Sequence, residues 1–166
     1  MQEYIKLVLT ILVLLFPFNS TGQNISIISW NIQDFGQTKD DDEILAIAKI
    51  IKDYDIVAIQ EVVAIHPGGA KAVARLADQL NRLGNKWDYR LSDPTQSPGK
   101  RTERYAFFWK TNKVRLIGKP WLDKTFEPVV YREPYLARFK VGDEQILVAN
   151  YHSRSYQDHP EEEIIC

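Results

Sequence analysis

The sequence predicts an α/β (α+β) fold, in which β-sheets form the frame and helices pack on them. In the first half of the chain, two helical patterns alternate with short apolar runs rich in β-branched residues, which is typical of strand–helix–strand units. In the second half, turn signals separate further apolar runs, which favours antiparallel strands. The pattern excludes a helical bundle, and no internal repeat is present.

The first half is predicted to contain a crossover unit. Residues 25–30 form a β-branched run that predicts a strand. Asp40-Asp41-Asp42 predicts a helix start, because short acidic side chains cap free backbone N–H groups. Apolar residues follow at helical spacing, and the run 55–60 predicts a buried strand. Strand, helix and strand in this order favour a parallel pair.

Turn and helix signals predict the remaining elements. Gly68-Gly69 opens a second helix, for which Gly84 is the expected stop. A short strand is expected at 87–91, and an exposed loop at 92–100, which has two prolines and a glycine. The remaining predictions are one hairpin that joins 104–110 to 113–117, a second that joins 135–141 to 145–151, and a helix start at 158–163.

Residues 1–22 have the composition of a signal peptide. A short charged head precedes the almost wholly apolar stretch 7–18, and the small residues Ser20 and Gly22 follow. We expect cleavage after Gly22, which leaves 166 − 22 = 144 residues, enough for one domain with a core. The protein is then expected to be secreted or periplasmic, with no stable membrane partner; an uncleaved N-terminal anchor is the alternative. The single cysteine, Cys166, provides no internal disulfide.

The charge balance excludes a broadly basic nucleic-acid binder. The chain has 21 Lys and Arg residues against 22 Asp and Glu residues, a net charge of −1. A protein that binds nucleic acid through charge alone carries a basic patch. A polyanionic substrate would therefore have to be bound locally, or through a cation.

Two apolar runs end on side chains that suit a hard metal ion. The first run is followed by Asn31, and the run 55–60 is followed by Glu61. Mg²⁺ takes oxygen ligands, usually one or two protein carboxylates together with water and substrate phosphate. The sequence therefore indicates a metal site, with Mg²⁺ expected and Ca²⁺ or Mn²⁺ as alternatives. The structural alternatives are a solvated charge at Glu61 and a turn-capping amide at Asn31.

Glu103 and His152 form a candidate catalytic pair. His152 directly follows the apolar run 146–151, and Glu103 precedes the predicted strand 104–110. A carboxylate beside a histidine holds the ring in one orientation, so that the imidazole can protonate a departing alkoxide or activate water. The alternatives are a hydrogen-bonded structural histidine and a surface ion pair of Glu103 with Arg101 or Arg104.

Arg132 is a candidate phosphate ligand. It lies just before the predicted strand 135–141. A guanidinium group can contact a phosphate through two parallel hydrogen bonds. A salt bridge with Glu133 or with a loop carboxylate is the alternative interpretation.

These residues lie in phrases that resemble the endonuclease/exonuclease/phosphatase superfamily, and within it the secreted deoxyribonucleases of the pancreatic type. The matching stretches are 30–36 (WNIQDFG), 54–62 (YDIVAIQEV), 103–109 (ERYAFFW), 112–114 (NKV), 132–134 (REP) and 152–153 (HS). They follow the family's order and cover nearly all of the chain after residue 24. The asparagine and glutamate phrases are shared by the whole superfamily, whereas ERY and REP favour the deoxyribonuclease branch.

The resemblance implies a DNase-like four-layer αββα sandwich that hydrolyses phosphodiesters with a divalent cation. By position, Glu61 would be a metal ligand and Asn31 would lie in the metal and phosphate shell. His152 would be a catalytic histidine that Glu103 orients, and Arg132 would contact the substrate phosphate.

The resemblance also implies that the fold is incomplete at the C-terminal half. The family's Asp-x-Asn phrase, a further aspartate and a terminal Ser-Asp-His phrase do not occur in the sequence. Residues 23–166 are therefore expected to be the N-terminal portion of the domain. Because groups that act as a unit fail together, we expect this portion to be inactive or nearly so on its own.

Nucleic acid is the expected partner, and DNA the favoured substrate. Val63 stands where the pancreatic type inserts an arginine into the minor groove, and Arg101 stands where it has a tyrosine. Arg101 and Arg104 could still contact backbone phosphates in a sequence-tolerant manner. Two alternatives remain: a phosphodiesterase for phospholipid or inositol-phosphate head groups, and a truncated, non-catalytic remnant. The sequence does not indicate the oligomeric state.

Overall fold

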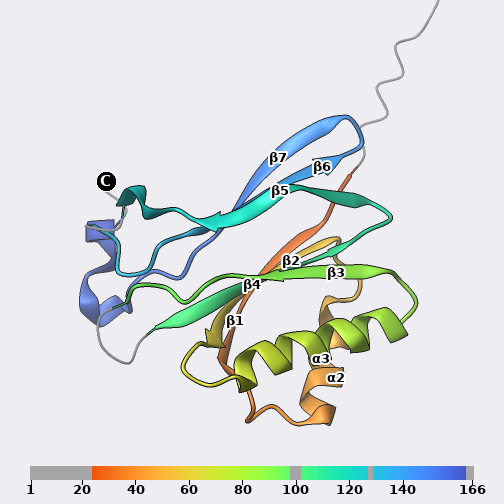
Figure 1. Ribbon diagram of the computed structural model, residues 1–166, viewed down its shortest axis with the longest axis horizontal. Coiled ribbons are helices and arrows are strands. Elements are labelled where there is room, and N and C mark those ends of the chain that lie inside the picture. Colours follow the sequence, from red (N-terminus) through yellow and green to blue (C-terminus); the bar gives the residue numbers. More distant parts are fainter. Residues whose placement is uncertain (1–23, 98–101, 127–128, 164–166) are drawn as a thin grey trace, which may run out of the picture.

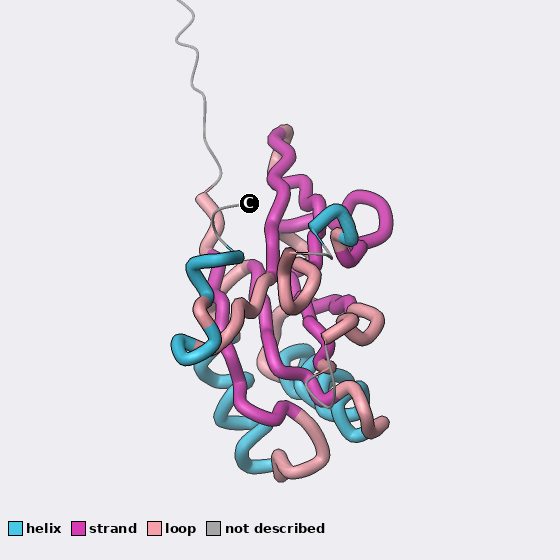
Figure 2. Tube along the Cα trace, turned by 90° about the vertical axis from the view of Figure 1, so that its left-hand side faces the viewer, coloured by secondary structure: helices cyan, strands magenta, loops and turns pink. Residues whose placement is uncertain are grey.

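The computed structural model describes residues 24–97, 102–126 and 129–163. Within these ranges, two β-sheets lie face to face, and two α-helices cover the outer side of one of them (Figure 1). The view turned by 90° shows the helices on the side away from the three-stranded sheet (Figure 2). The predicted α/β fold with two packed sheets is confirmed. The signal-peptide prediction for residues 1–22 lies outside the described residues.

The four-stranded sheet has the order β1-β2-β4-β3. Its strands are β1 (Ile27–Phe35), β2 (Ile56–Val63), β3 (Trp87–Leu91) and β4 (Glu103–Lys110). β1 and β2 pair in parallel and are connected by α2 (Asp41–Ile51), as the crossover prediction requires. β4 runs antiparallel to both of its neighbours, β2 and β3.

The two helices begin where the sequence predicts, for different physical reasons. Before α2, the side chain of Asp40 accepts the N–H of Glu43 at 2.8 Å, and the side chain of Glu43 accepts the N–H of Asp40 at 2.9 Å. This reciprocal capping box satisfies two otherwise free donors. α3 (Gly68–Arg82) begins at a glycine pair because a Cβ atom on Gly69 would lie 2.0 Å from the carbonyl oxygen of Val63. The start of α3 is thus packed tightly against the end of β2.

The three-stranded sheet is antiparallel and has the order β5-β6-β7. Its strands are β5 (Val114–Leu122), β6 (Tyr135–Val141) and β7 (Glu144–Asn150). The predicted hairpin 135–141/145–151 is confirmed, and Gly142 supplies a φ of +57° in its turn. A short 3-10 helix, Lys124–Phe126, follows β5.

The predicted hairpin between 104–110 and 113–117 is wrong. β4 belongs to the four-stranded sheet, whereas β5 begins the other sheet. The chain changes sheets at residues 111–113, where the flanking Lys110 and Lys113 lie 3.5 and 3.0 Å from the buried carboxylate of Asp55. This attachment to a distant residue turns the chain away from β4, so that β5 pairs with β6 instead.

Alternation along the strands of the first sheet produces two cores. Phe108 of β4 points toward the helices, and its neighbour Phe107 points toward the second sheet. Between the sheets, the ring of Phe107 stacks on Tyr135 with centroids 5.4 Å apart and meets Phe139 edge-on at 5.8 Å. Both faces of the first sheet are therefore covered, which is why β2 and β4 read as nearly continuous apolar runs.

Two further local predictions are wrong in part. The loop predicted at 92–100 is present in its described part, 92–97, where Asp93, Pro94 and Gln96 are exposed, but Ser92 and Thr95 are each only 2% exposed. Their hydroxyl oxygens accept the backbone N–H groups of Tyr105 and Glu103, at 2.9 and 3.2 Å, so this loop satisfies polar groups along the edge of β4. The helix expected from residue 158 is replaced by two short 3-10 helices, Tyr156–Asp158 and Pro160–Glu163. Throughout the described ranges, no helix has the length and apolarity needed to cross a bilayer.

Candidate active site

Strands from both sheets bring predicted site residues to one edge of the molecule. Asn31 lies in β1 and Glu61 in β2, and the parallel pairing of these strands brings the two residues to neighbouring positions. Glu103 begins β4 and pairs with Val63, so it lies beside the end of β2. His152 follows β7 by two residues and reaches the same edge from the second sheet. The candidate site therefore lies where the two sheets meet.

Glu61 has an unusual backbone conformation. Its φ is +58°, in the left-handed region, and it lies at a register shift between Ile59 and Val62 in the β2–β4 pairing. A non-glycine residue held in this conformation costs about 1–3 kcal/mol. Oε1 accepts a hydrogen bond from Nδ2 of Asn31 at 2.8 Å, and Oε2 accepts the N–H of Asp34 at 3.3 Å. These bonds hold the carboxylate at the rim, with 26% of the side chain exposed.

His152 is oriented by Glu103. Nδ1 lies 3.0 and 2.9 Å from the two carboxylate oxygens of Glu103. An ionised carboxylate can only accept, so this contact assigns a proton to Nδ1, and in the neutral ring it leaves Nε2 as an acceptor. Nε2 lies 3.4 Å from Nδ2 of Asn31 and 3.7 Å from Oε1 of Glu61. The imidazole therefore presents Nε2 to the edge that carries the candidate metal ligands.

Tyr105 supports His152 from below. Its hydroxyl oxygen accepts the backbone N–H of His152 at 3.3 Å. Burial raises the pKa of the Tyr105 phenol, and the negative charge of Glu103 raises it further, so the hydroxyl stays neutral. Tyr105 thus supplies a fixed polar contact without adding a charge to the site.

Arg132 lies behind this pair and contacts the same carboxylate. Its Nε is 3.3 Å from Oε2 of Glu103, and only 11% of its side chain is exposed. Nη1 donates to the carbonyl oxygens of His152 and Ser153, at 3.4 and 3.2 Å. The ion-pair partner of Arg132 is therefore Glu103, and not the adjacent Glu133. Arg132 fastens the segment after β7 to the start of β4.

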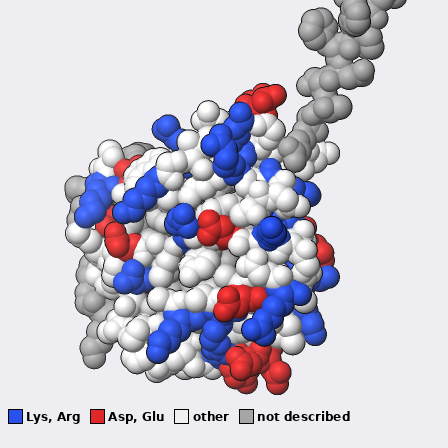
Figure 3. All heavy atoms as spheres, turned by 45° about the vertical axis from the view of Figure 1, so that its right-hand side comes forward, with Lys and Arg blue, Asp and Glu red and all other residues white. Residues whose placement is uncertain are grey.

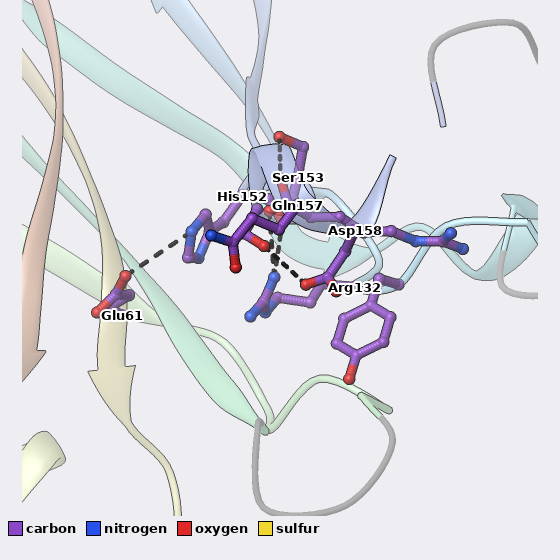
Figure 4. Close-up of a pocket in the computed structure, with 9 residues that line it drawn as sticks. Glu61, Arg132, His152, Ser153, Gln157 and Asp158 are labelled. Carbon is purple, nitrogen blue, oxygen red and sulfur yellow. Dashed lines mark hydrogen bonds and ion pairs between the residues drawn. The ribbon is translucent and has the colours of Figure 1, made fainter. Parts of the chain in front are cut away.

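A pocket of about 360 Å³ opens beside His152. Glu61, Arg132 and His152 line it, together with residues between Ser153 and Asp158 (Figure 4). Glu61 and Arg132 also line a smaller hollow of about 270 Å³, to which Glu103 contributes. A group that enters the pocket can thus contact an imidazole, a carboxylate and a guanidinium at once.

Arg104, another predicted site residue, does not line this pocket. Arg104 follows Glu103 on β4, so its side chain points to the opposite face of the strand. Its Nη1 donates to the carbonyl oxygen of Ser92 at 2.7 Å. Arg101 lies outside the described residues. Phosphate contacts by Arg101 and Arg104 stay predictions.

Two polar residues near the site were not singled out from the sequence. Asn150 and Gln60 are 1% and 4% exposed, and they bond to one another between the sheets. Asn150 ends β7 two residues before His152, and Gln60 lies within β2 directly before Glu61. An uncharged amide that follows an apolar run and directly or closely precedes a predicted site residue is the signal that could have found them.

The donor set at the rim fits a hard cation. Because Nδ2 of Asn31 donates to Glu61, the amide offers its oxygen, and Glu61 offers a carboxylate. Two oxygen donors suit Mg²⁺, which commonly keeps water and substrate phosphate as its other ligands. In the part of the chain that the structure describes, no group of three or more His, Cys, Asp or Glu side chains is arranged to hold a metal.

Acidic and basic side chains are interspersed on the face that Figure 3 displays.

Comparison with known proteins finds relatives named deoxyribonuclease. Deoxyribonuclease-1 of Oryctolagus cuniculus is 33% identical over 147 residues, which cover 83% of this chain and 49% of the relative. The Bos taurus enzyme of the same name is 35% identical over 125 residues, which cover 71% of this chain and 43% of the relative. A Thioalkalivibrio protein named deoxyribonuclease is 32% identical over 149 residues, 86% of this chain and 38% of the relative. The chain spans about half the length of the curated relatives it matches, or less.

Solved structures share the fold at low sequence identity. Humanized D. rerio TDP2 superposes with a TM-score of 0.60 at 16% identity, over 83% of this chain and 51% of that one. An endonuclease/exonuclease/phosphatase family protein from Leptotrichia buccalis gives a TM-score of 0.55 at 14% identity, over 86% of this chain and 61% of that one. The model of the Endonuclease/Exonuclease/phosphatase family matches residues 28–163. By fold and by sequence, the chain belongs to the Endonuclease/Exonuclease/phosphatase family.

Proposed function

We propose that this chain provides part of a divalent-cation-dependent phosphodiester hydrolase that acts on DNA. The convergence of Glu61, Arg132 and His152 in one pocket, with Glu103 behind the imidazole, is the observation that carries the proposal. The three relatives named above are deoxyribonucleases, and their names favour DNA over a phospholipid or inositol-phosphate head group.

The side chains of the pocket have separate parts in the proposed reaction. A cation held by Glu61 and Asn31 would stabilise negative charge on the phosphate. Water attacks phosphorus, a new phosphorus–oxygen bond forms, and the bond to the departing oxygen breaks. His152 acts through Nε2: it either accepts a proton from the attacking water or donates one to the departing oxygen. Glu103 holds the ring in place. Arg132 lies at the pocket wall and supplies positive charge near the phosphate.

We further propose Mg²⁺ as the cation and a secreted or periplasmic location for the mature protein. Oxygen donors from one carboxylate and one amide match the preference of Mg²⁺ for few protein ligands. Expression of the whole chain in a secreting host tests the location. A secreted product that begins at Gln23 is expected, and a product that keeps Met1 and stays in the membrane fraction would contradict it.

We also propose that residues 23–166 alone cleave DNA weakly or not at all. The curated relatives are about twice as long, and catalytic groups that act as a unit lose activity together. A form extended past Cys166 to the length of the relatives is expected to be active. Robust nicking of plasmid DNA by residues 23–166 with Mg²⁺ would overturn this part of the proposal.

The decisive experiment compares the extended form with two variants. Plasmid DNA is incubated with Mg²⁺, Mn²⁺ or Ca²⁺, and nicking is followed on gels. We expect nicking that is abolished by chelator and lost in Glu61→Gln and His152→Ala. No cleavage of DNA, RNA or phospholipid with any of these cations would overturn the hydrolase and favour a non-catalytic remnant. Cleavage of phospholipid in preference to DNA would overturn the substrate alone.

A further inference from the structure

Asn150 is a buried amide that joins the two sheets directly below the site. It is the last residue of β7 and is 1% exposed. Its Oδ1 accepts a hydrogen bond from Nε2 of Gln60 at 2.5 Å. Its Nδ2 donates to the carbonyl oxygens of Ile59 and Ala106, at 3.1 and 3.2 Å. One side chain of the second sheet thus bonds to two neighbouring strands, β2 and β4, of the first.

The contacts of Asn150 lie beside the β-bulge that contains Glu61. Ile59 and Ala106 form the last regular pair before the register of β2 and β4 shifts. A bulge disrupts the ladder locally and increases the twist of the strand. The amide of Asn150 supplies two N–H donors at this point, so it braces the strands where Glu61 takes its left-handed conformation.

Gln60 extends the network to the fourth strand. Besides its bond to Asn150, Nε2 of Gln60 donates to Oγ of Ser29 in β1 at 3.0 Å. The network therefore touches β1, β2, β4 and β7. On each strand, its contact lies within three residues of a candidate site residue: Ser29 before Asn31, Gln60 before Glu61, Ala106 after Glu103, and Asn150 before His152.

We propose that Asn150 and Gln60 are positioning residues that set the distance between His152 and the Glu61–Asn31 pair. The inference rests on the proposed function of this site. Apolar packing elsewhere between the sheets is non-directional and resists small sliding motions weakly. Hydrogen bonds prefer a narrow range of lengths and angles, so three of them from one side chain fix the second sheet against the first at this edge. The chain from Asn150 to His152 is only two residues long and transmits that position.

The chemistry of an amide suits this role better than other side chains. Asn150 uses one acceptor and both of its donors, and all three partners are buried or backbone groups. An aspartate would keep the acceptor but lose both donors and would bring a charge between the sheets. An apolar residue would leave two carbonyl oxygens and the Gln60 amide without partners, which is costly in a buried place.

The test compares Asn150→Ala and Asn150→Asp with a matched control, Asn81→Ala. Asn81 also bonds to three backbone groups: its Nδ2 donates to the carbonyl oxygens of Ala77 and Trp87, and its Oδ1 accepts the N–H of Trp87. It belongs to α3 and lies away from the site. Asn150→Ala and Asn81→Ala are both expected to lower Tm. Only the Asn150 variants are expected to change the site.

Two readouts on the cation-free and cation-loaded chain separate positioning from stability. The first is the nuclear Overhauser effect between the His152 ring and the Asn31 side-chain amide, measured without cation. We expect it in the wild type and in Asn81→Ala, and we expect its loss in both Asn150 variants. The second is Mn²⁺ affinity, which should fall about 10- to 100-fold in the Asn150 variants and stay unchanged in Asn81→Ala.

Each outcome bears on one proposal. Retention of the Overhauser effect in folded Asn150→Ala would overturn the positioning role, whatever the cation does. If the wild type does not bind Mn²⁺, the proposed function loses its cation, but the first readout still decides the positioning role. Should the Asn150 variants fail to fold, Ser29→Ala, which removes only the outermost acceptor of the network, is expected to weaken the Overhauser effect. An unchanged effect in that variant would count against the inference.

Discussion

Nδ1 of His152 lies 2.9 and 3.0 Å from the two carboxylate oxygens of Glu103, and Nε of Arg132 lies 3.3 Å from that same carboxylate. The side chain of Glu103 is 8% exposed, so its carboxylate is held by these two partners rather than by water. The carboxylate fixes the imidazole, and the guanidinium fixes the carboxylate. The orientation of His152 therefore depends on residues that need not touch the substrate.

This relationship predicts the effect of Glu103→Gln. The amide has nearly the shape of the carboxylate, but it cannot balance Arg132 or stabilise a positively charged ring. We expect kcat of the extended, active form to fall on the order of 10²-fold, with a smaller change in KM, because the group acts on proton transfer. Tyr105→Phe serves as the control, since it removes the hydroxyl below His152 but leaves the charges. An unchanged kcat in Glu103→Gln would contradict the orienting role.

The backbone conformation of Glu61 predicts that a glycine at this position is more stable than an alanine, although both lose the carboxylate of the site. At φ +58°, glycine is free of the strain that a side chain causes. Glu61→Gly is therefore expected to be more stable than Glu61→Ala by about 1 kcal/mol, although glycine usually lowers stability through the entropy of the unfolded chain. Both variants should lose cation binding. The free energy of unfolding, measured with urea, checks the difference, and a glycine variant less stable than the alanine variant would show that the bulge holds no strain.

Asp55 predicts a pH-dependent contribution to stability. Burial of its carboxylate opposes ionisation, but hydrogen bonds from Lys113 and Ser26 outweigh burial and hold the pKa of Asp55 below its usual value. A lowered pKa stabilises the fold above the unfolded pKa of about 4, and this stabilisation is lost as the pH falls through the folded value. Asp55→Asn should cost about 3 kcal/mol near neutral pH. The difference from the wild type should shrink below about pH 4.

Urea unfolding of both proteins at neutral and acid pH checks this sign. The two chains share all other carboxylates, so their common acid sensitivity cancels in the difference. If the loss of stability stayed constant into the acid range, Asp55→Asn would destabilise the fold through altered packing and not through the lost charge. The conformation of the turn at 111–113 should also respond to the charge of Asp55, because Lys110 and Lys113 both contact its carboxylate.

The strands that carry Asn31 and Glu61 could be predicted because their apolar runs leave a local pattern. Their ends could not, since β1 continues past Asn31 to Phe35 and β2 continues past Glu61 to Val63. The sheet that a strand joins leaves no such pattern. The Thr111-Asn112 turn suits a hairpin, but contacts of its flanks with Asp55 send β5 to the other sheet. The network of Asn150 was equally hidden, since its partner Gln60 is 90 residues away in the sequence. The pattern within a strand depends on neighbouring residues in the sequence, whereas contacts between the sheets join residues that are far apart in it.

Substitutions of Arg132 can distinguish the effect of its positive charge from the effect of its contact geometry. Its guanidinium group contacts Glu103 through Nε and the carbonyl oxygens of His152 and Ser153 through Nη1. Lysine keeps the positive charge but is a single donor centre and cannot make these divergent contacts together. Arg132→Lys should therefore lower kcat nearly as much as Arg132→Ala, with DNA affinity less affected than in Arg132→Ala. If the lysine variant kept the wild-type kcat, charge alone would suffice, and the anchoring of the segment after β7 would not matter for the reaction.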